Sequence, residues 1–168
     1  MGAQVLNTVV PEALKSMAEQ HRPFIVHQVG DRHLDTARQR YADLQVRGEV
    51  LAFIENMAER YAACDLVLCR AGALTIAELS AAGVASILVP YPHAVDDHQT
   101  CNALFLARAG AAILVPQQEF TAQKLTELLT HLTREKLLNM AMMARSLAKP
   151  DAAAVVAEVC VELSGAAA

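Results

Sequence analysis

Asp65-Leu66-Val67-Leu68-Cys69-Arg70-Ala71-Gly72-Ala73-Leu74-Thr75-Ile76-Ala77-Glu78, residues 65–78, is the stretch that decides the fold of this chain. The apolar run at 65–69 is typical of a strand that is buried on both faces of a sheet. A turn of small residues follows it, and a helix is expected from Leu74. A strand, a short turn and a helix in this order indicate one unit of a parallel α/β sheet.

Strands and helices alternate in both directions from this unit. Short β-rich or apolar runs predict strands at 23–27, 48–53, 65–69, 85–89 and 112–115. Helical spacing of apolar residues predicts a helix that begins near Ala3 and is kinked or restarted at Pro11, followed by helices at 34–44, 56–63, 74–82, 98–109, 121–132, 134–147 and 152–163. Thr121 and Asp151 are the expected N-caps of two of them. Right-handed crossovers make such strands parallel, so the predicted fold is α/β, a Rossmann-like doubly wound parallel sheet with helices on both faces.

Length and composition favour one compact domain spanning residues 1–168. Apolar residues make up 54% of the chain and charged residues 19%, which excludes a disordered protein. The net charge of −4 and the lack of any Lys/Arg cluster argue against a nucleic-acid partner. Four irregularly spaced cysteines indicate neither a disulfide framework nor a zinc site, which fits a reducing cytoplasm. The abrupt start on an apolar periodic pattern suggests a piece of a longer protein.

The first candidate site lies in the stretch quoted above. Ligands of open parallel sheets bind at the carboxyl ends of the strands, where Cys69 ends the central strand. Small residues there allow a ligand to approach the backbone, and the free amides of a helix start suit a diphosphate. Glu78, one turn into the helix, could accept hydrogen bonds from two ribose hydroxyls. The competing interpretation is a capping box, Thr75-x-x-Glu78, which needs no ligand.

The second candidate site is the loop at 90–99, Pro90-Tyr91-Pro92-His93-Ala94-Val95-Asp96-Asp97-His98-Gln99. It follows a buried strand, so the side chains of Asp97, His98 and Gln99 should reach the same rim and offer contacts to a sugar. The alternative is a proline-bounded loop in which an aspartate only caps the next helix.

Two weaker signals complete the candidate set. Phe53 and Ile54 follow another strand and could hold a base between a ring and a branched side chain, although an aromatic residue is more often part of the core. Gly2-Ala3 would be the end of a phosphate-binding turn. The sequence has no D-x-D or H-E-x-x-H pattern and no nucleophile elbow, so no metal, no cofactor and no covalent hydrolase is expected.

Taken in order and spacing, these motifs resemble the MurG family, the bacterial N-acetylglucosaminyltransferases of glycosyltransferase family 28. The resemblance covers nearly the whole chain and rests on four groups of residues. They are Gly2-Ala3-Gln4 with Leu6-Asn7, Phe53-Ile54 with Met57, Cys69-Arg70-x-Gly72-Ala73-Leu74-Thr75-x-x-Glu78, and His93 to Gln99 with Asn102-Ala103.

The resemblance implies a set of donor-binding residues. By this likeness the backbone of Ile54 pairs with uracil beside Phe53, and Glu78 holds the ribose. The start of the helix lies against the diphosphate, and His98 and Gln99 face the N-acetylglucosamine, with His98 replacing a glutamine that is more usual in the family. The implied donor-binding set is Gly2, Ala3, Phe53, Ile54, Arg70, Gly72, Ala73, Leu74, Thr75, Glu78, His98 and Gln99.

The resemblance also implies the role of the chain. It would be the C-terminal, donor-binding domain of a two-domain GT-B transferase that uses UDP-N-acetylglucosamine to convert lipid I to lipid II by inversion. The acceptor site and the catalytic base would lie in an N-terminal domain, so this chain would hold no catalytic residue and be inactive alone. The full-length protein would be cytoplasmic and peripheral on the inner membrane. The family's glycine-rich turn and first strand would precede residue 1, leaving the sheet without a central strand and the isolated chain marginally stable.

Two other functional interpretations stay open from sequence. One is another UDP-sugar GT-B transferase or a UDP-N-acetylglucosamine 2-epimerase-like domain, which also binds a nucleotide diphosphate. The other is a non-catalytic nucleotide-binding or interaction module. Loss of UDP-N-acetylglucosamine binding on replacement of Glu78 would favour the transferase.

Overall fold

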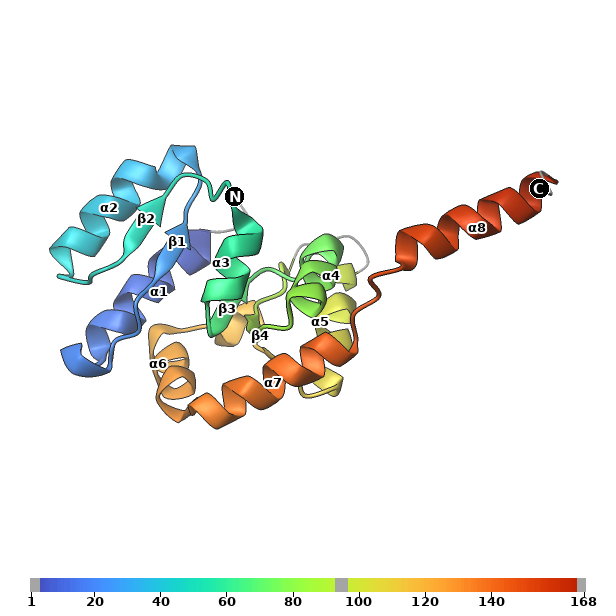
Figure 1. Cartoon of the computed structure of the whole chain (residues 1–168). Coiled ribbons are helices and arrows are strands. Elements are labelled where there is room, and N and C mark those ends of the chain that lie inside the picture. Colours follow the sequence, from blue (N-terminus) through green and yellow to red (C-terminus); the bar gives the residue numbers. More distant parts are fainter. Residues whose placement is uncertain (1–3, 93–96, 166–168) are drawn as a thin grey trace.

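The computed structural model describes residues 4–92 and 97–165. Strands and helices alternate along the chain, as predicted (Figure 1). The strands are β1 (Val26–Gln28), β2 (Glu49–Leu51), β3 (Leu66–Cys69), β4 (Ala85–Leu88) and β5 (Ala112–Leu114). The α-helices are α1 (Gln4–Ser16), α2 (Leu34–Asp43), α3 (Met57–Ala63), α4 (Ala73–Ala82), α5 (His98–Arg108), α6 (Ala122–His131), α7 (Arg134–Ser146) and α8 (Ala152–Ser164). Short 3-10 helices are η1 (Glu19–His21), η2 (Asp31–His33) and η4 (Gln117–Glu119).

The element boundaries differ from the prediction at two places near the N-terminus. Helix α1 is continuous through Pro11, so of the two predicted effects of this proline the restart was wrong, and a kink stays a prediction. The first strand begins at Val26 and not at Pro23, because its length is set by the three residues that pair with β2. Among the predicted N-caps, the Thr121 side chain accepts a hydrogen bond from Lys124 N at 3.1 Å. Asp151 occupies the N-cap position of α8 but its side chain makes no capping hydrogen bond.

All the strand pairs are parallel, and they form two ladders. Strand β1 pairs with β2, with His27 opposite Val50. Strand β4 lies between β3 and β5, with Ile87 opposite both Leu68 and Ile113. Among the described strands β3 is therefore an edge strand, and the prediction that it is central was wrong. The predicted parallel α/β class is therefore confirmed, but the described strands are split into a two-stranded and a three-stranded sheet. The further central strand expected ahead of residue 1 stays a prediction.

Alternate side chains of the three-stranded sheet enter two separate cores, one on each face. Ile87 and Val89 belong to a cluster with α1, α2 and α6, whereas Leu88 between them belongs to a cluster with α4, α5 and α7. Period-two alternation with apolar residues on both sides is what a strand covered on both faces requires. Helices therefore cover both faces of this sheet, as the predicted doubly wound architecture demands.

Helix α8 lies apart from both cores and extends away from the rest of the chain (Figure 1). Every residue of α8 is exposed, and its large apolar side chains are between 46% and 84% exposed, from Val159 to Leu163. No helix in the described ranges is both long and apolar enough to cross a membrane.

The end of α4 depends on Gly83. This residue has a φ of +67°, the left-handed conformation that ends many helices, and its N–H donates to Leu79 O at 2.9 Å. A Cβ at this position would lie 3.0 Å from Arg145 Cβ on α7. We expect Gly83→Ala to lower the free energy of unfolding by about 1–2 kcal/mol, from backbone strain and from this contact.

Urea unfolding measures this effect, with Gly110→Ala as the matched control. Gly110 also has a positive φ, +74°, but a Cβ there would meet no heavy atom within 4 Å. The control should therefore lose unfolding free energy through backbone strain only, and less than Gly83→Ala. Equal losses in the two variants would contradict a role for the packing of Arg145.

Candidate functional site

The candidate site is built on the carboxyl end of β3, where the chain turns into α4. Helix α4 begins at Ala73 with Gly72 as its N-cap, and the first intrahelical bond runs from Ile76 N to Gly72 O at 3.0 Å. No side chain among the described residues caps this helix. Thr75 is already inside the first turn, so the capping-box interpretation of Thr75 and Glu78 was wrong. The first-turn amides stay available to an anion.

Arg70 joins the ends of three strands at this rim. Its Nη1 donates to the carbonyl oxygens of Val89 and Pro90 at 2.9 and 3.0 Å, just beyond β4. Its Nη2 donates to Gln117 Oε1, in the turn after β5, and its guanidinium lies 5.5 Å from the centre of the Tyr91 ring. Partial burial lowers the pKa of Arg70. These contacts make Arg70 a residue that holds the rim together.

The loop after β4 is fixed to the start of α5. Tyr91 N donates to Gln99 Oε1 at 3.0 Å, and Asn102 Nδ2 donates to Ala71 O at 3.0 Å. The N-cap residue Asp97 makes no capping hydrogen bond and instead accepts one from Thr100 Oγ1 at 2.6 Å. Asn102 thus connects α5 to the β3–α4 turn, and Gln99 connects the same helix to Tyr91. His98 is exposed at the same helix start. Of the predicted residues, Gly2, Ala3 and the loop at 93–96 lie outside the described ranges.

Glu78 is exposed on α4 and is held by a residue from another helix. Tyr61 on α3 donates its hydroxyl hydrogen to Glu78 Oε2 at 3.1 Å. The charge of Glu78 also acts on Cys69 at the end of β3, whose pKa is raised to about 12, chiefly by burial and further by that charge. Cys69 is therefore a neutral thiol at physiological pH and a poor nucleophile.

Phe53 and Ile54 line a second part of the candidate site, at the end of β2. They border a hollow of about 450 Å³ whose remaining lining is Leu51, Glu55, Asn56, Glu59, Arg60 and Ala63. Phe53 is 67% exposed, so the interpretation of this ring as a core residue was wrong. The backbone N–H of Ile54 donates to Gln28 Oε1 at 2.9 Å, across the ends of β1 and β2.

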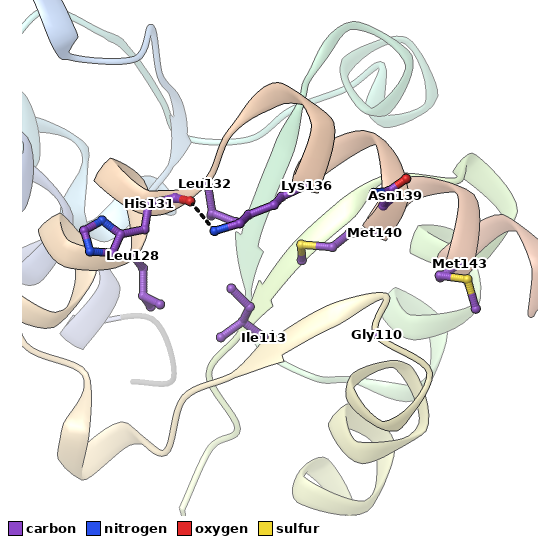
Figure 2. Close-up of a pocket in the computed structure, with 9 residues that line it drawn as sticks. All are labelled: Gly110, Ile113, Leu128, His131, Leu132, Lys136, Asn139, Met140 and Met143. Carbon is purple, nitrogen blue, oxygen red and sulfur yellow. Dashed lines mark hydrogen bonds between the residues drawn. The ribbon is translucent and has the colours of Figure 1, made fainter.

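A second hollow, of about 430 Å³, lies between β5, α6 and α7 (Figure 2). Its lining is mostly apolar, including Ile113, Leu128 and Met140, and Lys136 donates to His131 O at 3.0 Å across it. None of the predicted site residues lies in this hollow.

The structure therefore places the described predicted residues on three segments, after β2, at the turn from β3 into α4, and at the start of α5, and it adds others that sequence reasoning missed. Tyr61, Gln28 and Gln117 contact predicted residues, but no local motif marks them, because each contact joins segments at least 17 residues apart. Asn102 was part of the family motif, although its contact with Ala71 was not predicted. Among the described His, Cys, Asp and Glu side chains, no group of three is placed to hold a metal ion.

Comparison with known proteins decides what kind of domain this is. Residues 1–157 match the family model described as the glycosyltransferase family 28 C-terminal domain. The chain belongs to glycosyltransferase family 28. A family 28 relative from Nitrosomonas europaea, named UDP-N-acetylglucosamine--N-acetylmuramyl-(pentapeptide) pyrophosphoryl-undecaprenol N-acetylglucosamine transferase, is 59% identical over 98% of this chain and 46% of its own length. A protein of the same name from Nitrosospira multiformis is 56% identical over 97% of the chain and 46% of its own length.

A solved structure supports the same family placement. The crystal structure of MurG from Acinetobacter baumannii superposes with a TM-score of 0.87 and 44% sequence identity. The match covers 95% of this chain and 48% of the MurG chain. This family 28 chain thus spans about half the length of the relatives it matches.

Proposed function

We propose that this chain is the C-terminal, donor-binding domain of an N-acetylglucosaminyltransferase of peptidoglycan synthesis, and that its ligand is UDP-N-acetylglucosamine. The observation that carries the proposal is the 59% identity, over 98% of the chain, with a protein named for transfer of N-acetylglucosamine to a lipid-linked muramyl pentapeptide. The uncapped start of α4 beside an oriented Glu78 supports the same ligand class, a nucleoside diphosphate.

Each part of the donor has a chemically suited position in this proposal. The diphosphate binds at the start of α4, near Gly72, where the amides of Ala73, Leu74 and Thr75 and the positive end of the helix dipole meet its charge. Glu78 accepts hydrogen bonds from the two ribose hydroxyls. The base lies on Phe53 and pairs with the backbone of Ile54, which requires the Gln28 amide to release the Ile54 N–H. His98 and Gln99 contact the sugar, Arg70 maintains the rim, and Gly2 and Ala3 complete the phosphate site.

In the proposed reaction, the acceptor's hydroxyl attacks the anomeric carbon from the face opposite the departing UDP, and the configuration inverts. The start of α4 stabilises the negative charge that develops on the diphosphate. The general base and the site for lipid I belong to an N-terminal acceptor domain. The whole protein acts in the cytoplasm, on the inner face of the membrane, and this chain binds the donor without turning it over.

Isothermal titration of the chain with UDP-N-acetylglucosamine, UDP and ADP tests the proposal. Both uridine ligands should bind more tightly than ADP, since the base contact selects uracil. Glu78→Ala should weaken UDP binding about tenfold through the loss of hydrogen bonds to an exposed carboxylate. Glu135→Ala, an exposed carboxylate on α7, is the matched control and should leave binding unchanged.

The outcomes separate the rival functions. Equal affinity for UDP and ADP would contradict a uridine-specific donor site. Unchanged UDP affinity in the Glu78 variant would contradict the assignment of the ribose to this residue. Conversion of UDP-N-acetylglucosamine to its 2-epimer by the chain alone would favour the epimerase-like alternative.

A further inference from the structure

The hydrogen bond between Tyr61 and Glu78 joins two elements of the candidate site that the sequence pattern treats separately. Helix α3 follows directly from the turn that carries Phe53 and Ile54, with Asn56 as its N-cap. Tyr61 lies on the next turn of this helix and reaches Glu78 on α4 at 3.1 Å. One side chain therefore connects the turn that borders the hollow at the end of β2 with the proposed ribose acceptor.

The two partners differ in how firmly the protein holds them. The Tyr61 ring is half-buried and packs against the core cluster that contains Ile76, Leu79 and Leu88. Glu78 is exposed, and an exposed glutamate samples many rotamers unless a neighbour fixes it. The fixed ring thus restricts the mobile carboxylate, and not the reverse. Ordering a side chain before a ligand arrives lowers the entropy lost on binding.

The direction of the hydrogen bond suits recognition of a diol. Burial, reinforced by the charge of Glu78 and by the hydrogen bond, raises the pKa of Tyr61 well above its usual value. The phenol consequently keeps its proton and donates a hydrogen bond. This bond occupies one lone pair of Glu78 Oε2 and none of Oε1. A carboxylate has about four lone-pair positions on two oxygens, so Oε1 and the rest of Oε2 remain for two adjacent hydroxyl donors.

From this geometry we infer that Tyr61 is a positioning residue which orients Glu78 toward the vicinal hydroxyls of a ribose and thereby selects ribonucleotides over deoxyribonucleotides. The inference rests on the proposed function, because it takes Glu78 to be the ribose acceptor. It adds a determinant of specificity that lies outside the stretch at 65–78.

The test compares the affinities of the whole chain for UDP and 2′-deoxy-UDP by isothermal titration. The dissociation constant for 2′-deoxy-UDP divided by that for UDP measures recognition of the diol. A general loss of fold weakens both ligands alike and leaves this ratio unchanged. Tyr61→Phe keeps the ring and removes only the hydroxyl. We expect this variant to weaken UDP binding about fivefold, the effect of one hydrogen bond, and 2′-deoxy-UDP binding by much less. The ratio therefore falls.

Two further variants make the test specific. Tyr41→Phe removes a hydroxyl that contacts His27 at 2.9 Å in the other core cluster, and it should leave the ratio as in the wild type. In Glu78→Ala the ratio should already be close to one, and adding Tyr61→Phe should lower it no further, because the hydroxyl acts through the carboxylate.

The outcomes distinguish this inference from the proposed function. A reduced ratio in Glu78→Ala with a wild-type ratio in Tyr61→Phe would overturn the role of Tyr61 and leave the ribose assignment intact. A wild-type ratio in Glu78→Ala, or no discrimination by the wild-type chain, would overturn both. Thermal unfolding of each variant checks that the fold persists.

Discussion

Lowering the pH from 7 to 4 is expected to reduce the free energy of unfolding by about 3 kcal/mol through His27 alone. This residue lies in β1, is only 9% exposed, and contacts the Tyr41 hydroxyl at 2.9 Å through Nδ1. Burial lowers the pKa of His27 from 6.5 to about 4. The imidazole is therefore neutral in the folded chain at a pH where the unfolded chain already carries the proton.

The sign of the effect follows from proton uptake. Above pH 6.5 His27 is neutral in both states and costs nothing. Between pH 6.5 and about 4 only the unfolded state is protonated at His27, so each step of acidification favours unfolding. Below about pH 4 both states bind the proton and the loss is complete. The difference between 6.5 and about 4 corresponds to about 3.4 kcal/mol in full, of which about 3 kcal/mol is lost by pH 4, where half of the folded molecules are protonated at His27.

Urea unfolding at several pH values between 7 and 4 measures this loss. Carboxyl groups also titrate in this interval. The effect of His27 is therefore the loss of unfolding free energy in the wild type minus the loss in His27→Gln. The variant should lose about 3 kcal/mol less than the wild type over the interval. His131→Gln, which replaces an exposed imidazole on α6, is the control. Parallel pH profiles for the wild type and His27→Gln would contradict the prediction, as would an NMR titration of His27 with a midpoint near 6.5.

The sequence predicted the fold well where the signal was local. The apolar run at 65–69 predicts β3 because its side chains pack alternately against the two cores, Leu66 and Leu68 on one face and Val67 and Cys69 on the other, although all four are only partly buried. The start of β1 was not predictable in this way. Its ladder begins at Val26, opposite Glu49, and a partner strand 23 residues away decides that boundary.

The candidate site shows the same division between local and long-range signals. The turn at 69–73 was recognisable from its small residues. The alternative interpretation, a capping box at Thr75, was wrong because the N-cap of α4 is Gly72. For Phe53 the sequence left a base-binding and a core position open, and the general preference of aromatic side chains favoured the core. The ring lies two residues beyond the last residue of β2 and outside both cores. The contact of Tyr61 with Glu78 depends on how α3 packs against α4, which no periodicity in the sequence reports.

The rim of the site depends on one side chain, that of Arg70. Its turns come from three strands. Backbone hydrogen bonds hold the first residue beyond β4 and beyond β5, from Val89 N to Cys69 O and from Val115 N to Leu88 O, both at 2.9 Å. The turns that follow need a further connection. Arg70 supplies the connection by donating to Val89 O, Pro90 O and Gln117 Oε1. Its planar guanidinium presents several donors at fixed angles, which a lysine ammonium does not reproduce.

We therefore expect Arg70→Ala to lower the free energy of unfolding by about 3 kcal/mol, since it leaves partly buried acceptors without a donor. Arg70→Lys should recover less than half of this loss. Arg134→Ala is the control, because the ion pair of Arg134 with Asp65 spans 3.6 Å between exposed side chains and should contribute under about 0.5 kcal/mol. Urea unfolding of the three variants measures the ranking.

Titration with UDP then separates the effect on the rim from the effect on global stability. Loss of Arg70 frees the turn at Pro90 and Tyr91, and Tyr91 N is the group that fixes the Gln99 side chain at the start of α5. If the proposed donor site is correct, UDP-N-acetylglucosamine should lose more affinity than UDP in Arg70→Ala, since only the sugar contacts Gln99. Equal losses for the two ligands would show that Arg70 supports the fold without shaping the sugar end of the site.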